Sequence, residues 1–358
     1  MSGPATSPAP AVPVPAGPAV GVPAPGTGAP WEEIARRAAE LHRKVQEEVG
    51  RRVIGAELAV RQLLIGLFCE GHILLEGVPG LAKTYLVRSF AESLALSFRR
   101  IQFTPDMLPS DILGTMVLLP RTQDLEYRPG PIFANVVLAD EINRAPPKVQ
   151  SALLEAMQER QVTLEGVSHA LPRPFLVIAT QNPVEQEGTY PLPEAELDRF
   201  LFRLLLSYPD EAKEVEILRR EASRGDPEIP PIPVGTETLE LLRRGAEGVR
   251  VHEDILRFLT SVIRATRTDP RVLLGASPRS AVQFLRAVRA SSLLSGRAYA
   301  IPDDVKALAF PVLNHRLIVR PEIEAQQIAG GSAGLGDPTQ RVIAELVHSI
   351  LQRLPSPR

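Results

Sequence analysis

Between residues 31 and 208, short apolar runs alternate with stretches that have helical spacing. The runs are HILLE at 72–76, VVLA at 136–139, FLVIAT at 175–180 and LFRLLL at 201–206. Apolar runs of this length, separated by helices, are typical of buried parallel strands. The pattern therefore predicts an α/β domain with a parallel sheet over residues 31–208.

Helical spacing begins at Trp31 and dominates the second part of the chain. From about Pro209 onward no further apolar run of that kind occurs, and apolar residues recur every three or four positions. The clearest stretches are EAKEVEILRREAS at 211–223, ILRFLTSVIRAT at 255–266 and AVQFLRAVRASSLL at 281–294. We expect an all-α second domain over residues 209–358.

Residues 1–30 have a different composition, almost wholly Pro, Ala, Gly and Val. Such a segment has no hydrophobic period and few backbone donors, which predicts a disordered, partly polyproline-like tail. It lacks the basic start and unbroken apolar core of a secretory signal. A docking arm for a partner is the alternative interpretation.

The whole-chain composition narrows the class of protein. The 358 residues are 44% apolar and 23% charged, as in a soluble globular protein of about two domains, and no run is long enough to span a membrane. A formal charge of -2 makes nucleic acid an improbable partner. The single cysteine, Cys69, is interpreted as a core residue, and a cytoplasmic location is expected because no intrachain disulfide is possible and an oxidising compartment is not required. The isolated histidines give no support for zinc.

The segment GVPGLAKTY at 77–85 is close to the phosphate-binding pattern G-x-x-x-x-G-K-[ST]. It lies between the predicted strand 72–76 and a predicted helix, so the free N–H groups of the helix start would face an anion. Lys83 would reach the β and γ phosphates of ATP and Thr84 would bind Mg²⁺. The expected nucleotide contacts are Gly77, Val78, Pro79, Gly80, Leu81, Ala82, Lys83, Thr84 and Tyr85.

Ala82 stands where the pattern has its last glycine, so the loop could be working, degenerate or accidental. Its methyl group matters only if the backbone there needs a positive φ or must approach the phosphates closely. Because Lys83 already begins a helix, where alanine is favoured over glycine, we interpret the loop as a working variant.

Two further strands end in polar residues. VVLADE at 136–141 ends in Asp140 and Glu141, which could hold the magnesium shell and polarise a water molecule. The strand at 175–180 is followed by Gln181 and Asn182, and Asn182 fits both a phosphate-edge amide and an Asn-Pro turn. Arg199 before a strand and Arg279 at a helix start could stabilise charge on a γ phosphate, although a lone arginine is by default a solvated side chain.

Together, GVPGLAKT, VVLADEINRAPPKVQSALLEAMQE, ATQNP, YPLPEAELDRF and GASPRS resemble the MoxR family of AAA+ ATPases, over about residues 31–354. The resemblance implies a P-loop nucleotide domain with a helical lid. It implies that Gly77 to Thr84 form Walker A and that Asp140 and Glu141 form Walker B, with Glu141 activating water and Asn182 acting as sensor 1. Ile54 and Gly55 would pack against the adenine.

Two arginine roles also follow from the resemblance. Arg199 resembles the arginine finger, which acts on the nucleotide of a neighbouring subunit, while Arg144 and Arg203 lie in comparable segments and stay alternatives. Arg279 resembles sensor 2, which contacts the γ phosphate from the lid.

The family further implies a ring, expected to be a hexamer, with a chaperone-like role, often a von Willebrand A domain partner and sometimes metal insertion. Residues 107–131 and the hairpin expected at 161–174 resemble insertions that face a channel or client, although a plain surface hairpin is equally compatible. An ATP-binding switch with little turnover is the rival hypothesis, and a nucleic-acid motor is disfavoured by net charge.

Overall fold

A five-stranded parallel sheet forms the centre of the computed structural model, which describes residues 28–78, 80–121, 123–181, 188–222, 229–232, 234–329 and 337–357. The strand order is β2-β5-β8-β1-β9. The strands are β1 (His72–Glu76), β2 (Phe98–Gln102), β5 (Val136–Asp140), β8 (Leu176–Gln181) and β9 (Phe200–Leu205). Since all five are parallel, their carboxyl ends lie at one edge of the sheet.

Alternate residues of the central strands face two hydrophobic clusters, one on each side of the sheet. In β1, Ile73 and Leu75 belong to the first cluster and Leu74 to the second. The second cluster includes Val149 and Leu153, which lie on the apolar face of α5. Helices on this part of the chain are α2 (Glu57–Cys69), α3 (Lys83–Ser93), α4 (Pro109–Leu113), η1 (Ile142–Arg144), α5 (Pro147–Glu159) and α6 (Glu194–Leu197).

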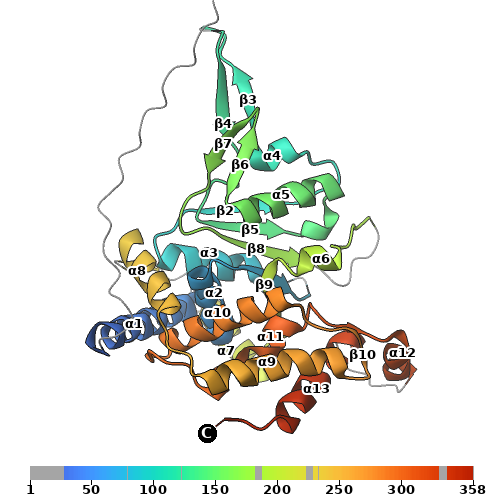
Figure 1. Cartoon of the computed structure of the whole chain (residues 1–358). Helices are drawn as coiled ribbons and strands as arrows, with labels where there is room; N and C mark the ends of the chain where they lie inside the picture. Colours follow the sequence, from blue (N-terminus) through green and yellow to red (C-terminus); the bar gives the residue numbers. More distant parts are fainter. Residues whose placement is uncertain are drawn as a thin grey trace, which may run out of the picture.

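Two antiparallel hairpins project from the sheet on the side away from the C-terminal helices (Figure 1). The insertion expected at 107–131 contains α4 and the pair β3 (Gly114–Leu118) and β4 (Leu125–Pro129). The expected second hairpin is confirmed as β6 (Gln161–Leu164) and β7 (Val167–Ala170). The rings of Tyr127 and His169 stack with centroids 4.1 Å apart, so the two hairpins are in contact.

The C-terminal part is helical, as expected. Its helices are α7 (Glu211–Ala222), α8 (Thr236–Glu247), α9 (Glu253–Thr268), α10 (Pro278–Leu294), α11 (Pro302–Leu313), α12 (Pro321–Ala329) and α13 (Pro338–Arg353). The sequence did not predict the short strands β10 (Val272–Leu274) and β11 (Ile318–Val319), which pair antiparallel within it. We call residues 209–357 the lid.

The lid and the sheet share one hydrophobic cluster. That cluster runs from Ile73 and Ile178 in the sheet to Phe284 and Val312 in the lid. The first helix, α1 (Gly28–Arg52), packs against α3 as well as α8 and α10, so it contacts both parts. Figure 1 shows α1 and the lid helices on the same side of the sheet.

Helix α1 begins at Gly28, so the last three residues of the segment expected to be a disordered tail are helical. The rest of that segment lies outside the described residues. In the part of the chain that the structure describes, no helix is both long and apolar enough to cross a bilayer.

Candidate nucleotide site

The loop between β1 and α3 has two glycines that another residue would disturb, Gly77 through a steric clash and Gly80 through its backbone conformation. A Cβ on Gly77 would lie 2.9 Å from the carbonyl oxygen of Leu206, where the chain leaves β9. Gly80 has a φ of +88°, in the left-handed region that favours glycine, and an added Cβ would meet nothing within 4 Å. Pro79 lies outside the described residues. The loop therefore turns tightly against β9 and stays open on its outer side.

Ala82 has a left-handed backbone, with φ 50° and ψ 28°. Helix α3 does begin at Lys83, as predicted, but Ala82 itself has the positive φ at which its methyl group matters, so the preference of helices for alanine does not apply to it. A residue with a Cβ is disfavoured there because it approaches the following carbonyl oxygen, at about 1–2 kcal/mol. The glycine of the pattern matches this conformation, and Ala82 holds it at a cost in stability.

Lys83 points back across the loop. Its Nζ donates a hydrogen bond to the carbonyl oxygen of Gly77 at 2.6 Å. Burial lowers the pKa of the Lys83 ammonium, and the nearby carboxylates of Asp140 and Glu141 oppose that shift. The structure thus brings the lysine and the two predicted carboxylates to the same edge of the sheet.

The Asp140 carboxylate is held on two sides at the end of β5. Thr180 of β8 donates its hydroxyl hydrogen to Asp140 Oδ1 at 2.6 Å, and Arg100 of β2 donates from Nε to Oδ2 at 2.9 Å. The Thr180 oxygen also accepts from the backbone N–H of Glu141 at 2.9 Å. One hydroxyl therefore sets the geometry of both acidic residues.

Glu141 has a positive φ of 58°, and its side chain is held separately from that of Asp140. Its Oε2 accepts a hydrogen bond from Gln102 Nε2 at 2.7 Å and one from Arg144 Nη1 at 3.0 Å. Arg100, Gln102 and Thr180 are functional residues that the sequence did not predict. Only Thr180 had a signal, since it is the last residue of a predicted strand.

The residues at this edge fit Mg²⁺ bound together with a nucleotide. The described residues contain no cluster of three or more His, Cys, Asp or Glu side chains that could hold a metal. Mg²⁺ is usually bound by one or two carboxylates together with phosphate oxygens. Asp140 and the Thr84 hydroxyl, in the first turn of α3, supply a donor set of that kind.

Ile54 and Gly55, the expected adenine contacts, lie between α1 and α2. Gly55 has a φ of +75°, and a Cβ there would lie 3.1 Å from Cδ of Lys213 in α7 of the lid. The guanidinium of Arg52 lies 5.9 Å from the ring centroid of Tyr85, a cation–π contact. This segment therefore lies beside the first turn of α3 and beside the lid.

The remaining residue predicted from the end of β8, Asn182, lies outside the described residues. The two alternatives for the arginine finger have partners in their own chain. Arg203 pairs with Glu76 at 2.6 Å, with both side chains largely buried, and Arg144 pairs with Glu141.

Arg199 and Arg279 line a second site, a pocket of about 180 Å³ at the opposite edge of the sheet. His72 and Phe200 are register partners at the amino ends of β1 and β9, and His72 and Arg199 both line this pocket. A five-residue strand such as β1 separates the two edges by about 13 Å. Arg279 therefore faces away from the P-loop of its own chain, and the lid-to-phosphate contact expected from the sequence would have to reach another chain.

A third arginine, Arg286, lines the same pocket from two turns further along α10. Within the described residues, the guanidinium groups of Arg199, Arg279 and Arg286 have no hydrogen-bond or ion-pair partner. Three unpaired guanidinium groups around one pocket form a site suited to an anion.

Two titratable groups beside this pocket have structural roles. Burial raises the pKa of the Cys69 thiol to about 12, which agrees with the interpretation of Cys69 as an unreactive residue. Burial lowers the pKa of His72 to about 4. The neutral His72 ring donates from Nε2 to the carbonyl oxygen of Met157 and accepts at Nδ1 from the N–H of Val177, both at 3.0 Å.

The chain is similar to known proteins in its sequence. Residues 72–202 match the sequence model of the ATPase family associated with various cellular activities (AAA), and residues 264–332 match the AAA lid domain. The chain is 46% identical over 286 residues to the uncharacterized protein YeaC of Bacillus subtilis, covering 80% of this chain and 89% of YeaC. It is 44% identical over 303 residues to the chaperone MoxR1 of Mycobacterium tuberculosis, covering 82% of this chain and 80% of MoxR1.

The fold has a solved counterpart. The crystal structure of a candidate ATPase from Cytophaga hutchinsonii superimposes with a TM-score of 0.81 at 40% identity, covering 91% of this chain and 98% of that one. Fold and site define an AAA-type ATPase with a helical lid. Within that class, the chain belongs to the MoxR family of AAA+ ATPases.

Proposed function

We propose that the protein hydrolyses Mg-ATP at the boundaries between subunits of a ring, expected to have six members. One observation carries this proposal: the phosphate loop with its carboxylates and the unpaired Arg199 and Arg279 occupy opposite edges of one parallel sheet. Neither edge alone has everything that phosphoryl transfer needs. Copies stacked edge to edge would complete a site at every boundary.

At its own edge, each chain would bind and orient the nucleotide. Lys83 would exchange its contact with the Gly77 carbonyl for phosphate oxygens, while Ile54, Gly55 and Tyr85 would contact the adenine side. Thr84 and Asp140 would hold Mg²⁺, which would neutralise charge on the β and γ phosphates.

Glu141 would position the attacking water and accept its proton. The hydrogen bonds from Gln102 and Arg144 hold its carboxylate in place, and Asn182 would help to orient the same water. From the next subunit, Arg199 and Arg279 would stabilise charge that develops on the γ phosphate.

We propose further that hydrolysis drives chaperone-like remodelling or maturation of partner proteins in the cytoplasm, with a von Willebrand A domain protein as the expected type of partner. The name of the similar chaperone MoxR1 supports the first part. The two hairpins on the far side of the sheet expose the apolar side chains Leu118, Leu125 and Val167. Such side chains suit contact with a client.

A second candidate is an ATP-binding switch with little turnover. The departure from the phosphate-binding pattern at Ala82 motivates it, since the alanine holds a left-handed backbone at a cost in stability. Steady-state ATPase activity of the assembled wild-type ring separates the two functions.

The Glu141→Gln variant tests the assignment of the catalytic base. We expect it to bind ATP as the wild type does and to lose nearly all turnover, because the amide cannot accept the proton of the attacking water. Glu155→Gln, at an exposed position of α5, is the matched control and should keep full turnover. Unchanged turnover of Glu141→Gln would reject the role of Glu141.

A subunit-mixing experiment tests whether Arg199 acts across a boundary. Rings of Arg199→Ala subunits should be nearly inactive, as should rings of Lys83→Ala subunits. In mixed rings, an intact P-loop next to an intact Arg199 should restore part of the activity. The absence of rescue at every ratio, in rings shown to mix, would contradict action in trans.

A further inference from the structure

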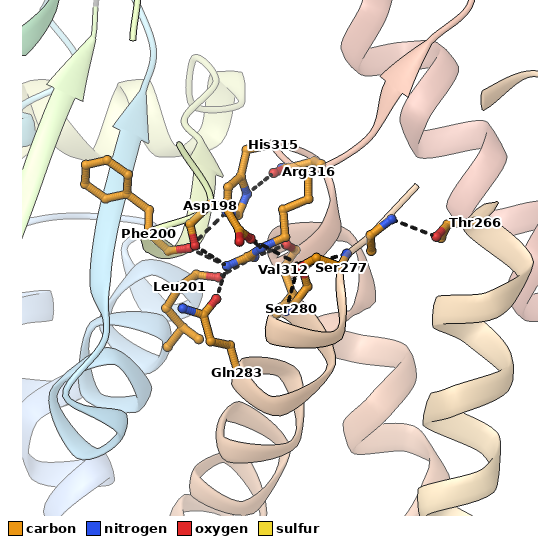
Figure 2. A network of polar contacts seen from close by, with 12 residues as sticks. Asp198, Phe200, Leu201, Thr266, Ser277, Ser280, Gln283, Val312, His315 and Arg316 are labelled. Carbon is orange, nitrogen blue, oxygen red and sulfur yellow. Dashed lines mark hydrogen bonds and ion pairs between the residues drawn. The ribbon is translucent and has the colours of Figure 1, made fainter. Parts of the chain in front are cut away.

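The segment Asn314, His315 and Arg316, directly after α11, connects the lid to β9 of the same chain. Figure 2 shows the contacts that it makes around the first residues of this strand. Asn314 donates from Nδ2 to the carbonyl oxygen of Arg203 at 3.0 Å. His315, which burial keeps neutral by lowering its pKa, donates from Nε2 to the carbonyl oxygen of Phe200 at 3.0 Å.

Arg316 is the centre of this connection, and its side chain is only 2% exposed. Its Nε donates to the Asp198 carboxylate at 2.7 Å, and its terminal nitrogens donate to the carbonyl oxygens of Phe200 at 2.6 Å and Leu201 at 3.1 Å. It also donates to Val312 and to the side-chain oxygen of Gln283 in α10. A buried guanidinium with partners on every side has one orientation, because losing any contact would leave a buried polar group unpaired.

The partners of Arg316 are sequence neighbours of the two arginines in the anion pocket. Asp198 directly precedes Arg199, and its Oδ1 also accepts a hydrogen bond from the Ser280 hydroxyl at 3.2 Å. Ser280 directly follows Arg279 and forms a reciprocal helix cap with Ser277 at the start of α10. Gln283 lies one turn beyond Arg279 and lines the same pocket.

We propose that Arg316 is a positioning residue for ATP hydrolysis: by binding Asp198 and Gln283 together, it fixes Arg199 and Arg279 relative to each other, so that both reach one nucleotide of the neighbouring subunit. This proposal rests on the proposed function, in which those two arginines act across the boundary. Arg316 itself touches no nucleotide. It follows that the lid and the sheet of one chain present their arginines as a single rigid surface.

The Arg316→Met variant tests the proposal, because methionine keeps much of the buried volume and removes every polar contact. We expect kcat to fall about tenfold to a hundredfold, since misplacing catalytic groups by about 1 Å can have effects of that size. The KM for ATP should stay within about twofold, because the P-loop edge of the same subunit is unchanged.

Arg297→Met is the matched control. Arg297 pairs with the buried Asp304 at 2.7 Å, and this pair joins the end of α10 to α11 without touching β9. Its loss should lower the melting temperature to an extent similar to that of Arg316→Met and leave kcat within about twofold of the wild type. If Arg316→Met does not fold, Gln283→Leu replaces it, because it cuts only the link from Arg316 to α10.

Mixed rings separate positioning from a general structural effect. Subunits with Arg316→Met keep an intact P-loop, and Lys83→Ala subunits keep properly placed arginines. In mixed rings, the turnover per Arg316→Met subunit should therefore be at least about threefold higher than in rings of Arg316→Met alone. A structural defect inside the subunit's own site would not respond to its neighbour. A variant that loses turnover without such rescue, or Gln283→Leu rings with wild-type turnover, would overturn the proposal.

The same mixing experiment with Arg199→Ala distinguishes the positioning role of Arg316 from the proposed function on which it rests. Rescue of Arg199→Ala but not of Arg316→Met removes only the positioning role of Arg316. Failure to rescue either variant removes the proposed function itself, and the role of Arg316 with it.

Discussion

Replacing Ala82 by glycine should stabilise the protein, although a helix-based argument predicts the opposite. At φ 50°, the methyl group of Ala82 costs about 1–2 kcal/mol, which glycine would remove. Glycine also gains freedom in the unfolded chain, which costs about 0.5–1 kcal/mol. The net expectation for Ala82→Gly is a gain of about 0.5–1 kcal/mol in the free energy of unfolding.

Thermal unfolding of both proteins, measured side by side without nucleotide, checks this value. For a chain of this size, the gain corresponds to a rise of about 1 °C in melting temperature. Ala325→Gly is the control, because Ala325 is exposed within helix α12 and glycine there should cost about 1 kcal/mol. The two substitutions are chemically identical and should shift the melting temperature in opposite directions.

ATP affinity supplies the second measurement. Calorimetric titration should find the Ala82→Gly dissociation constant within about tenfold of the wild-type value, because the loop already has the conformation that glycine prefers. A lower melting temperature for Ala82→Gly, or a larger change in affinity, would refute the left-handed backbone at this position.

Two further predictions concern buried polar contacts. Thr180→Val should lower the free energy of unfolding by about 1–3 kcal/mol and reduce kcat at least about tenfold, because the hydroxyl that aligns Asp140 and Glu141 is lost. Denaturant titration measures the first effect and ATPase assays the second. Thr163→Val, at an exposed position, is the control. His72 has a folded-state pKa of about 4, below its unfolded value, so its contribution to stability is complete above about pH 6.5 and is lost as pH falls toward 4, by up to about 3 kcal/mol. A His72→Gln variant should show a shallower decline in stability over that pH range, and an equally steep decline would contradict the assignment.

The central sheet could be predicted because four of its strands are buried on both faces and therefore have continuous apolar runs. Strand β2 lies at the sheet edge, and of its residues only Ile101 is buried, so FRRIQ has no such run. Because the sequence does not predict β2, it does not predict Arg100 and Gln102 as partners of Asp140 and Glu141 either. Strands β10 and β11 are too short for any period to be visible.

The site could be predicted as far as it depends on local order along the chain. The P-loop lysine and the β5 carboxylates follow their strands directly, so the parallel sheet alone brings them together. The conformation of Ala82 belongs to a loop whose first glycine, Gly77, packs against Leu206 of a distant segment, and the location of Arg279 depends on how the lid sits on the sheet. Neither is encoded in a short stretch of sequence.

In the proposed ring, the separation of the P-loop and the arginine pocket across one sheet has a consequence for how activity depends on protein concentration. An open row of subunits has one fewer complete site than it has members, and an isolated subunit has none. Only a closed ring completes a site for every chain. Specific activity should therefore rise with protein concentration, from near zero for separated chains to a plateau when the rings are closed. Assembly itself would then switch the activity on.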